Sequence, residues 1–186
     1  MKRIPSFLAL IFFCLSAAAQ TPEQTGGVYY AYPAPSVTRV HPAPAGFKPF
    51  YISHYGRHGS RYLTSEDDYT YVLSFFEDRG NLTDEGRKVA KELSRIWKDA
   101  KGHAGQLTPL GEKQHRGIAL RMYRTFPEVF LGQGAVNAYS STSGRCIKSM
   151  EAFTGELEEL NPDLEVNTSS DRSNMEFIAH TDKAHT

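Results

Sequence analysis

Residues 136–160 constrain the fold most, because a strand candidate there leads directly into an apolar helix face. The run VNAYSS, Val136 to Ser141, has the character of a strand and is followed by the turn Thr142-Ser143-Gly144-Arg145. Apolar residues then recur at spacings of three and four, which is typical of one face of a helix: Ile147, Met150, Phe153, Leu157 and Leu160. This order predicts an α/β unit.

The same patterns predict further elements on both sides of this unit. Helices are expected over Glu66–Arg79, from Thr83 to Gly102, and from Thr108-Pro109 to Pro127. Short strands are expected at Phe50–Ile52 and Leu164–Asn167. Core-packing faces are predicted on two of the helices, at Val89, Leu93, Ile96, Trp97 and Ala100, and at Ile118, Met122 and Phe126. The alternation of strand and helix predicts an α/β sheet flanked by helices, with a helical insert.

The clearest chemical motif directly follows the first strand candidate, in YISHYGRHGSRY, and is Arg57-His58-Gly59-Ser60-Arg61. A neutral imidazole can attack phosphorus, so His58 is a candidate nucleophile. Guanidinium groups are always charged and present a planar fork of donors that matches phosphate oxygens. Gly59 allows the backbone to approach a ligand closely. The alternative interpretation is a solvated basic turn.

Arg145 is a third candidate for the same anion site. It falls in the first turn of the helix predicted after residue 141, where free backbone N–H groups and the helix dipole favour anions. A surface arginine is the alternative. Strand ends are also where ligands bind in open α/β sheets, which favours a site formed by both turns.

Together these motifs resemble the histidine acid phosphatase family, the branch of histidine phosphatases with the R-H-G-x-R signature, which includes phytases and the multiple inositol polyphosphate phosphatases. Arg57 to Arg61 match that signature, and Tyr62 after it resembles the inositol polyphosphate phosphatase subgroup. Two later blocks are also similar: LTPLGEKQHRGIALRMYR, Leu107 to Arg124, and SSTSGRCIKSMEAFTGEL, Ser140 to Leu157. The resemblance covers residues from about Phe50 to Leu160 and implies a partial histidine-phosphatase-like sheet.

The resemblance implies a secreted phosphomonoester hydrolase that works in two steps. His58 would form a phosphohistidine, and Arg57, Arg61 and Arg145 would bind and stabilise the phosphoryl group. Tyr62 is expected with the arginines in substrate binding. The implied substrates are inositol polyphosphates, phytate-like, or other small phosphoesters, and no metal or other cofactor is expected.

One family feature has no clear counterpart in this sequence. Family members carry, near the carboxyl end of a longer chain, an H-A-E or H-D motif that protonates the leaving group. His180-Thr181-Asp182 has related spacing but follows the third-arginine block too closely. The chain therefore resembles an amino-terminal portion of such an enzyme. Two alternatives stay open: a phosphate-binding remnant without turnover, and a non-enzymatic secreted interaction domain in which the arginines are incidental.

The amino-terminal residues predict export. Residues 1–19 combine Lys2 and Arg3, an apolar run and Ala17-Ala18-Ala19, which is typical of a signal peptide, with a lipid anchor at Cys14 as the alternative. Residues 20–49 form a predicted extended arm rich in Pro, Gly and Ala, and residues 50–186 the phosphatase domain. The expected location is secreted or periplasmic, without stable membrane insertion after removal of the signal.

Charge and the remaining reactive residues exclude other classes of function. The chain has 21 basic and 21 acidic residues, which argues against nucleic-acid partners and leaves a small phosphorylated substrate. Cys146 lacks the downstream arginine that a thiolate phosphatase needs. His54 and His58 have the spacing of helical metal ligands, but Gly56 argues against a helix there. The other histidines are predicted to be surface residues: His41, His103, His115 and His185.

Overall fold

The computed structural model describes residues 21, 25–34, 41–131 and 134–178. The chain divides into two compact units, residues 1–33 and 34–186. In the first unit a 3-10 helix, η1, spans Gly27–Tyr29. The predicted signal peptide, residues 1–19, lies outside the described residues. The boundaries predicted for the arm and the phosphatase domain stay predictions.

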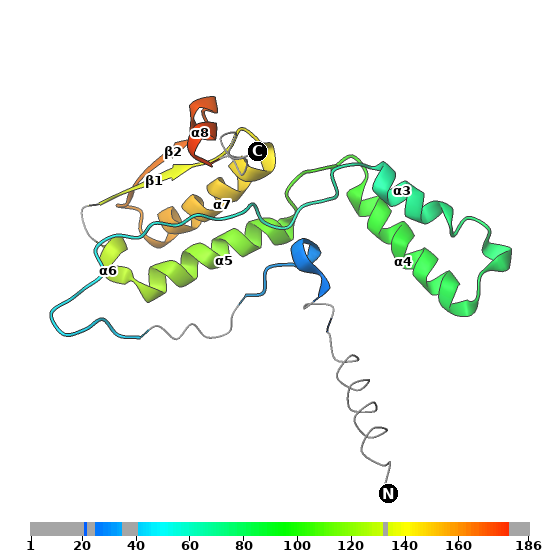
Figure 1. Cartoon of the computed structure of the whole chain (residues 1–186), viewed down its shortest axis with the longest axis horizontal. Coiled ribbons are helices and arrows are strands. Elements are labelled where there is room, and N and C mark those ends of the chain that lie inside the picture. Colours follow the sequence, from blue (N-terminus) through cyan, green and yellow to red (C-terminus); the bar gives the residue numbers. More distant parts are fainter. Residues whose placement is uncertain (1–20, 22–24, 35–40, 132–133, 179–186) are drawn as a thin grey trace, which may run out of the picture. The chain divides into compact units, whose positions relative to one another are not determined.

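The second unit is an α/β structure with a small parallel sheet (Figure 1). No helix among the described residues has both the length and the apolar character needed to cross a bilayer. The predicted helices are confirmed, although the one expected over Glu66–Arg79 ends at Ser74, and so are the strands expected at Val136–Ser141 and Leu164–Asn167. In chain order the elements are α3 (Asp67–Ser74), η2 (Arg79–Asn81), α4 (Asp84–Ala100), α5 (Pro109–Thr125), α6 (Pro127–Phe130), β1 (Ala135–Tyr139), α7 (Gly144–Leu160), β2 (Glu165–Ser169), η3 (Arg172–Asn174) and α8 (Met175–Ile178).

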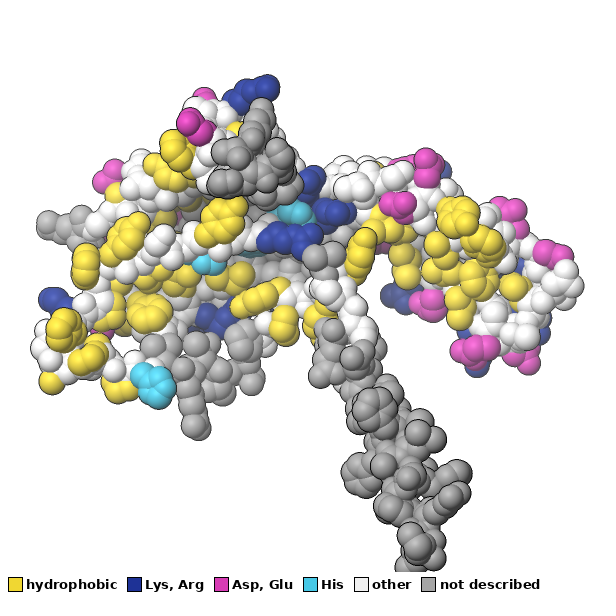
Figure 2. All heavy atoms as spheres, viewed as in Figure 1, with side chains coloured by type: hydrophobic (Ala, Val, Ile, Leu, Met, Phe, Trp, Pro, Cys, Tyr) yellow, Lys and Arg dark blue, Asp and Glu magenta, His cyan; other side chains and the backbone are white. Residues whose placement is uncertain are grey.

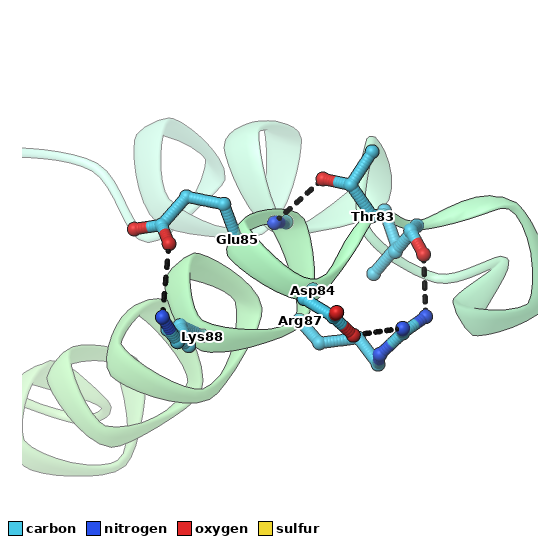
Figure 3. Close-up of polar contacts among 7 residues, drawn as sticks. Thr83, Asp84, Glu85, Arg87 and Lys88 are labelled. Carbon is cyan, nitrogen blue, oxygen red and sulfur yellow. Dashed lines mark hydrogen bonds and ion pairs between the residues drawn. The ribbon is translucent and has the colours of Figure 1, made fainter.

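Helix α4 begins where the sequence supplies a cap. The Thr83 hydroxyl accepts a hydrogen bond from the backbone N–H of Gly86 at 3.1 Å, which satisfies a donor that the helix itself cannot pair (Figure 3). Asp84 and Glu85 place negative charge at the positive end of the helix dipole. Arg87 pairs with Asp84 and Lys88 with Glu85, so both acids are also held by cations one turn later (Figure 3).

The sheet and α7 form one β-α-β unit. β1 and β2 are parallel, with Val136 paired to Val166 and Asn137 to Asn167. α7 connects them and packs along α5 (Figure 1). The core lies between these elements and is formed by Ala119, Phe130, Leu157 and Leu164, with Ile52, Met122, Tyr123, Val129, Val136, Phe153 and Val166 packed against it.

Two local predictions are wrong. Phe50–Ile52 forms no strand, and Phe50 and Tyr51 are 87% and 72% exposed, although Ile52 packs on the core. A strand needs a hydrogen-bonded neighbour, and in the described residues this segment first pairs at Arg61, opposite Leu107. The predicted core face of α4 is incomplete, because Val89 and Ile96 are 41% and 51% exposed.

Candidate functional site

The turn at residues 57–61 is held from one side by the start of α5. The backbone of Ser60 is bonded twice: its N–H donates to Oε1 of Gln114 at 2.8 Å, and its carbonyl accepts from the Thr108 N–H at 2.9 Å. The Thr108 hydroxyl also donates to the Ser60 carbonyl at 2.9 Å while capping α5 through the Gly111 N–H. Thr108 and Gln114, both in the family-like block Leu107 to Arg124, thus fix the turn to α5.

Two glycines make this close approach possible. A Cβ on Gly59 would lie 2.5 Å from the carbonyl oxygen of Gly111 and 2.6 Å from its Cα. A Cβ on Gly111 would likewise clash with the Ser60 carbonyl oxygen. Real Cβ atoms do not approach backbone this closely, so both positions require glycine.

Helix α7 holds the turn from the other side, through Ser149. Its hydroxyl accepts the Gly59 N–H at 3.2 Å and donates to the Arg145 carbonyl at 2.8 Å. Ser149 is 3% exposed, so it joins the turn to the first turn of α7 inside the structure. Sequence reasoning missed Ser149; its position four residues after Arg145, on the same helix face, was the available signal.

The structure brings His58 and the three predicted arginines together. The positive charges of Arg145, Arg57 and Arg61 all act on the imidazole of His58, although Arg145 is far away in the sequence. Figure 2 shows dark blue basic side chains gathered beside a histidine near the middle of the view. Burial is the largest effect on His58 and lowers its pKa, and the arginine charges lower it further. The hydrogen bond to Gly59 acts in the opposite direction.

That hydrogen bond also fixes the tautomer of His58. Nδ1 lies 2.8 Å from the Gly59 carbonyl oxygen. Because a carbonyl oxygen only accepts hydrogen bonds, Nδ1 must carry the proton. In the neutral ring Nε2 is then unprotonated, and its lone pair is the one available for attack.

None of the three arginines forms an ion pair with a carboxylate in the part of the chain that the structure describes. Arg61 donates from Nη1 to the Tyr62 carbonyl at 2.8 Å, and Arg57 is exposed along the wall of a cavity. Nε of Arg145 is buried and has no hydrogen-bond partner. Three cations without a described carboxylate partner, one of them with a buried free donor, are suited to bind an anion.

Tyr62 is placed differently from the arginines. Its hydroxyl donates to Oδ2 of Asp99 at 3.1 Å, and its ring stacks on His103 with centroids 5.3 Å apart. Burial and the Asp99 carboxylate raise the pKa of Tyr62. These contacts connect the end of the turn to α4. A role for Tyr62 in substrate binding stays a prediction.

A cavity of about 500 Å³ opens beside the turn. His54, Arg57, His58 and His115 lie along its polar part, and Phe153 and Val136 are among its apolar residues. His54 stacks on Phe153, with ring centroids 5.5 Å apart. The prediction that His115 is a surface residue is wrong, because it is 7% exposed on the inner side of α5. The charged residues near it in the sequence, Lys113 and Arg116, made an exposed position the expected one.

The general acid of the predicted reaction has no counterpart among the described residues. No carboxylate there contributes to the electrostatic environment of His58. His180-Thr181-Asp182 lies outside the described residues. In the same described part of the chain, no group of His, Cys, Asp and Glu side chains has an arrangement suited to a metal ion.

Comparison with known proteins gives a similarity to a solved structure. No protein-family model and no curated protein matches the chain. Among solved structures it resembles the crystal structure of the Bifidobacterium longum multiple inositol polyphosphate phosphatase in complex with inositol hexasulfate, at 29% identity and a TM-score of 0.51. The match covers 69% of this chain and 27% of that one, so this chain spans about a quarter of the similar protein. The similarity supports a histidine-phosphatase-like relationship.

Proposed function

We propose that this chain carries the phosphate-binding part of a secreted phosphomonoester hydrolase that acts through a phosphohistidine. The observation that carries the proposal is the convergence of Arg57, Arg61 and Arg145 on His58, with Nε of Arg145 buried and unpaired. A phosphoryl group would offer a hydrogen-bond acceptor to Nε of Arg145 and negative charge to all three arginines. The similarity to a phosphatase supports phosphoester hydrolysis as the type of reaction.

In the first step, the Nε2 lone pair of His58 would attack phosphorus. A P–N bond forms while the P–O bond to the leaving alcohol breaks, and that oxygen takes a proton from a general acid. In the second step, water would attack the phosphohistidine, the P–N bond would break, and inorganic phosphate would leave. The arginines would stabilise the charge on the equatorial oxygens in both steps.

The substrate class we propose is inositol polyphosphates or similar small phosphoesters. The similar phosphatase is named for inositol polyphosphates, and its structure holds inositol hexasulfate. The local excess of positive charge at the turn would also favour a substrate with several phosphates over a singly charged ester. Tyr62, next to Arg61, would lie at the edge of the bound molecule.

A second candidate is phosphate binding without turnover. It is favoured by one specific observation, namely that no described carboxylate acts on His58. Without a proton donor for the leaving alcohol, the first step would be slow even with the arginines in place.

The two candidate functions predict different products after incubation with a phosphorylated substrate. The full chain would be incubated at mildly acidic pH with a ³²P-labelled inositol polyphosphate and assayed for acid-labile phosphohistidine and free phosphate. A complete hydrolase gives both, and a half-competent one gives the label without steady release. Both signals should disappear in His58→Ala. No label in the native chain, together with phosphate binding, would identify the binding-only candidate.

Export is proposed from residues 1–19 alone. Expression of the full gene in a bacterium and amino-terminal sequencing of the periplasmic product would test it. A mature protein that begins at or close to Gln20 is expected, and an intact Met1 in the cytoplasm would contradict it.

A further inference from the structure

The hydroxyl of Ser149 joins two parts of the site that are far apart in the sequence. It accepts a hydrogen bond from the Gly59 N–H at 3.2 Å and donates one to the Arg145 carbonyl at 2.8 Å. The bond to Arg145 is a common one, because helix serines often bond to the carbonyl four residues earlier. The bond from Gly59 is different, since it crosses from α7 to the turn at residues 57–61.

The two partners fix the direction of the Ser149 hydroxyl. A carbonyl only accepts hydrogen bonds, so the O–H proton points to Arg145, and a backbone N–H only donates, so a lone pair of the same oxygen faces Gly59. Ser149 is 3% exposed, and water therefore has little access to replace either partner. One buried oxygen atom thus holds the Gly59 N–H and the Arg145 carbonyl at a fixed separation.

The bond from Gly59 acts on the backbone directly beside the nucleophile. The Gly59 N–H belongs to the peptide unit that follows His58, and because a peptide unit is planar, fixing its N–H restricts rotation of the backbone at His58. The Gly59 carbonyl in turn accepts the bond from Nδ1 of His58 at 2.8 Å. The next peptide unit is held separately, through the Ser60 N–H and Oε1 of Gln114 at 2.8 Å.

We propose that Ser149 is a positioning residue, which holds the backbone at His58 against that of Arg145 so that both side chains reach one phosphoryl group. Ser149 lies along the same cavity as Arg57 and His58. The inference rests on the proposed function, since this alignment matters only where phosphate binds. Small errors in the placement of reacting groups are costly in both binding and rate.

The first test removes the hydroxyl, with inorganic phosphate as the probe and calorimetry on the full chain. Ser149→Ala should bind phosphate about fivefold more weakly than the native chain. Thr154→Val is the matched control, because Thr154 is also 3% exposed on α7 and its described hydrogen bond, to the Glu151 carbonyl at 3.4 Å, stays within the helix. Its phosphate binding should stay within about twofold of the native value. Equal binding by Ser149→Ala and Thr154→Val would overturn the proposal.

A double-mutant cycle separates positioning from a general effect on the fold. Arg145→Ala removes the guanidinium but keeps the backbone carbonyl to which Ser149 bonds. If Ser149 acts by aligning Arg145 with His58, the loss caused by Ser149→Ala should shrink from about fivefold to about twofold or less in the Arg145→Ala background. An equal loss in both backgrounds would overturn the positioning role.

Hydrogen exchange of single amides gives a local readout. The Gly59 amide should exchange at least about tenfold faster in Ser149→Ala than in the native chain, because its acceptor is gone. The Ser60 amide, which bonds to Gln114, should keep its native rate and is the internal control. Equal acceleration of both amides would indicate general loosening of the turn and would overturn the specific role of Ser149.

The native chain alone provides a test where Ser149→Ala does not fold. Its Gly59 amide should exchange at least about tenfold more slowly than the same amide in an unstructured peptide, and exchange at the unstructured rate would overturn the proposal. Failure of the inference is distinct from failure of the proposed function. Native protein that binds no phosphate would contradict the proposed function, whereas native binding that Ser149→Ala leaves unchanged would contradict the role of Ser149 alone.

Discussion

Gly59 and Gly111 determine how closely the turn at residues 57–61 can approach α5. Neither takes part in the proposed chemistry, yet a single methyl group on either would meet backbone atoms that cannot move independently. The arginines and His58 depend on this contact for their positions, because their backbone is fixed through Ser60 to the start of α5. At the scale of single residues, the site is therefore specified by its smallest side chains as much as by its charged ones.

Gly59→Ala should destabilise the fold and weaken phosphate binding. The added Cβ would lie 2.5 Å from the Gly111 carbonyl oxygen, and overpacking of this kind costs about 1–3 kcal/mol. Gly155→Ala in α7 is the control, because nothing lies within 4 Å of its Cβ position and alanine favours helix by up to about 1 kcal/mol. Unfolding in urea measures the stability of both variants. A Gly59→Ala protein as stable as Gly155→Ala would contradict the described contact.

Arg145→Ala should raise the pKa of His58. Its positive charge disfavours the imidazolium, so its removal makes protonation easier. Titration of the imidazole Hε1 signals by NMR measures the change, with His54 as the internal control, because its pKa is lowered by burial alone. An unchanged pKa of His58 would place Arg145 away from the ring.

Stability should fall as the pH drops below about 6.5, the ordinary pKa of histidine. The pKa values of His54, His58 and His115 are all lowered in the folded chain. Between those lowered values and about 6.5, the unfolded chain binds more protons than the folded one, so the free energy of unfolding rises with pH there and the histidine contribution levels off above it. Urea unfolding from pH 5 to 8 tests this. If the histidine contribution to the free energy of unfolding increased as the pH fell, this would contradict the burial of these side chains.

At the scale of elements, the pair α5 and α7 is the scaffold of the site. α5 carries Gln114 and is capped by Thr108, and α7 carries Arg145 and Ser149. The packing of one helix on the other therefore decides whether the two halves of the site meet. Apolar packing and an ion pair both connect these helices, but they are expected to contribute different amounts to the stability of the fold.

Leu157→Ala should destabilise the chain far more than Arg116→Ala. Leu157 is fully buried in the core, and removing such a side chain costs about 2–5 kcal/mol. Arg116 bonds to Glu159 at 2.9 Å and to Glu156 at 3.3 Å, but its side chain is 43% exposed, so its loss should cost at most about 1 kcal/mol. Urea unfolding of both variants gives the comparison, and an equal cost would contradict it.

Thr108→Ala and Thr83→Ala should separate capping from positioning. Each threonine caps a helix through a glycine N–H at 3.1 Å, which is worth about 1 kcal/mol. Only Thr108 also donates to the Ser60 carbonyl, at 2.9 Å. Both variants should lose stability in urea, but only Thr108→Ala should bind inorganic phosphate more weakly, and Thr108→Ser should restore it. Equal phosphate binding by both alanine variants would contradict the positioning role.

The sequence predicts helices better than tertiary contacts. The 3.6-residue apolar period and the Thr caps located α4, α5 and α7 to within a few residues, because these signals are local. The strand at Phe50–Ile52 was wrong, since pairing depends on a neighbour that a local pattern does not reveal. The burial of His115 and the hydrogen bond from Gly59 to Ser149 were missed for a related reason: both depend on contacts with residues distant in the sequence.

At the scale of the whole molecule, charge is balanced but unevenly distributed. The chain has 21 basic and 21 acidic residues, yet around His58 the described groups that act through their charge are all arginines. Asp84, Glu85 and Glu92 of α4 pair instead with basic residues of the same helix, as Figure 3 shows for Asp84 and Glu85. A concentration of unpaired positive charge at one place on a neutral chain is typical of an anion site.

The most direct test of this account is calorimetric titration of the full chain with inorganic phosphate, comparing native protein with Arg57→Ala, Arg145→Ala and the control Arg116→Ala. We expect one phosphate site in the native chain. Arg57→Ala and Arg145→Ala should each bind at least about tenfold more weakly, because a hydrogen bond to a charged group is worth about 1.5–3 kcal/mol. Arg116→Ala should bind as the native chain does. Absence of binding by the native chain, or equal affinity in all four proteins, would contradict it.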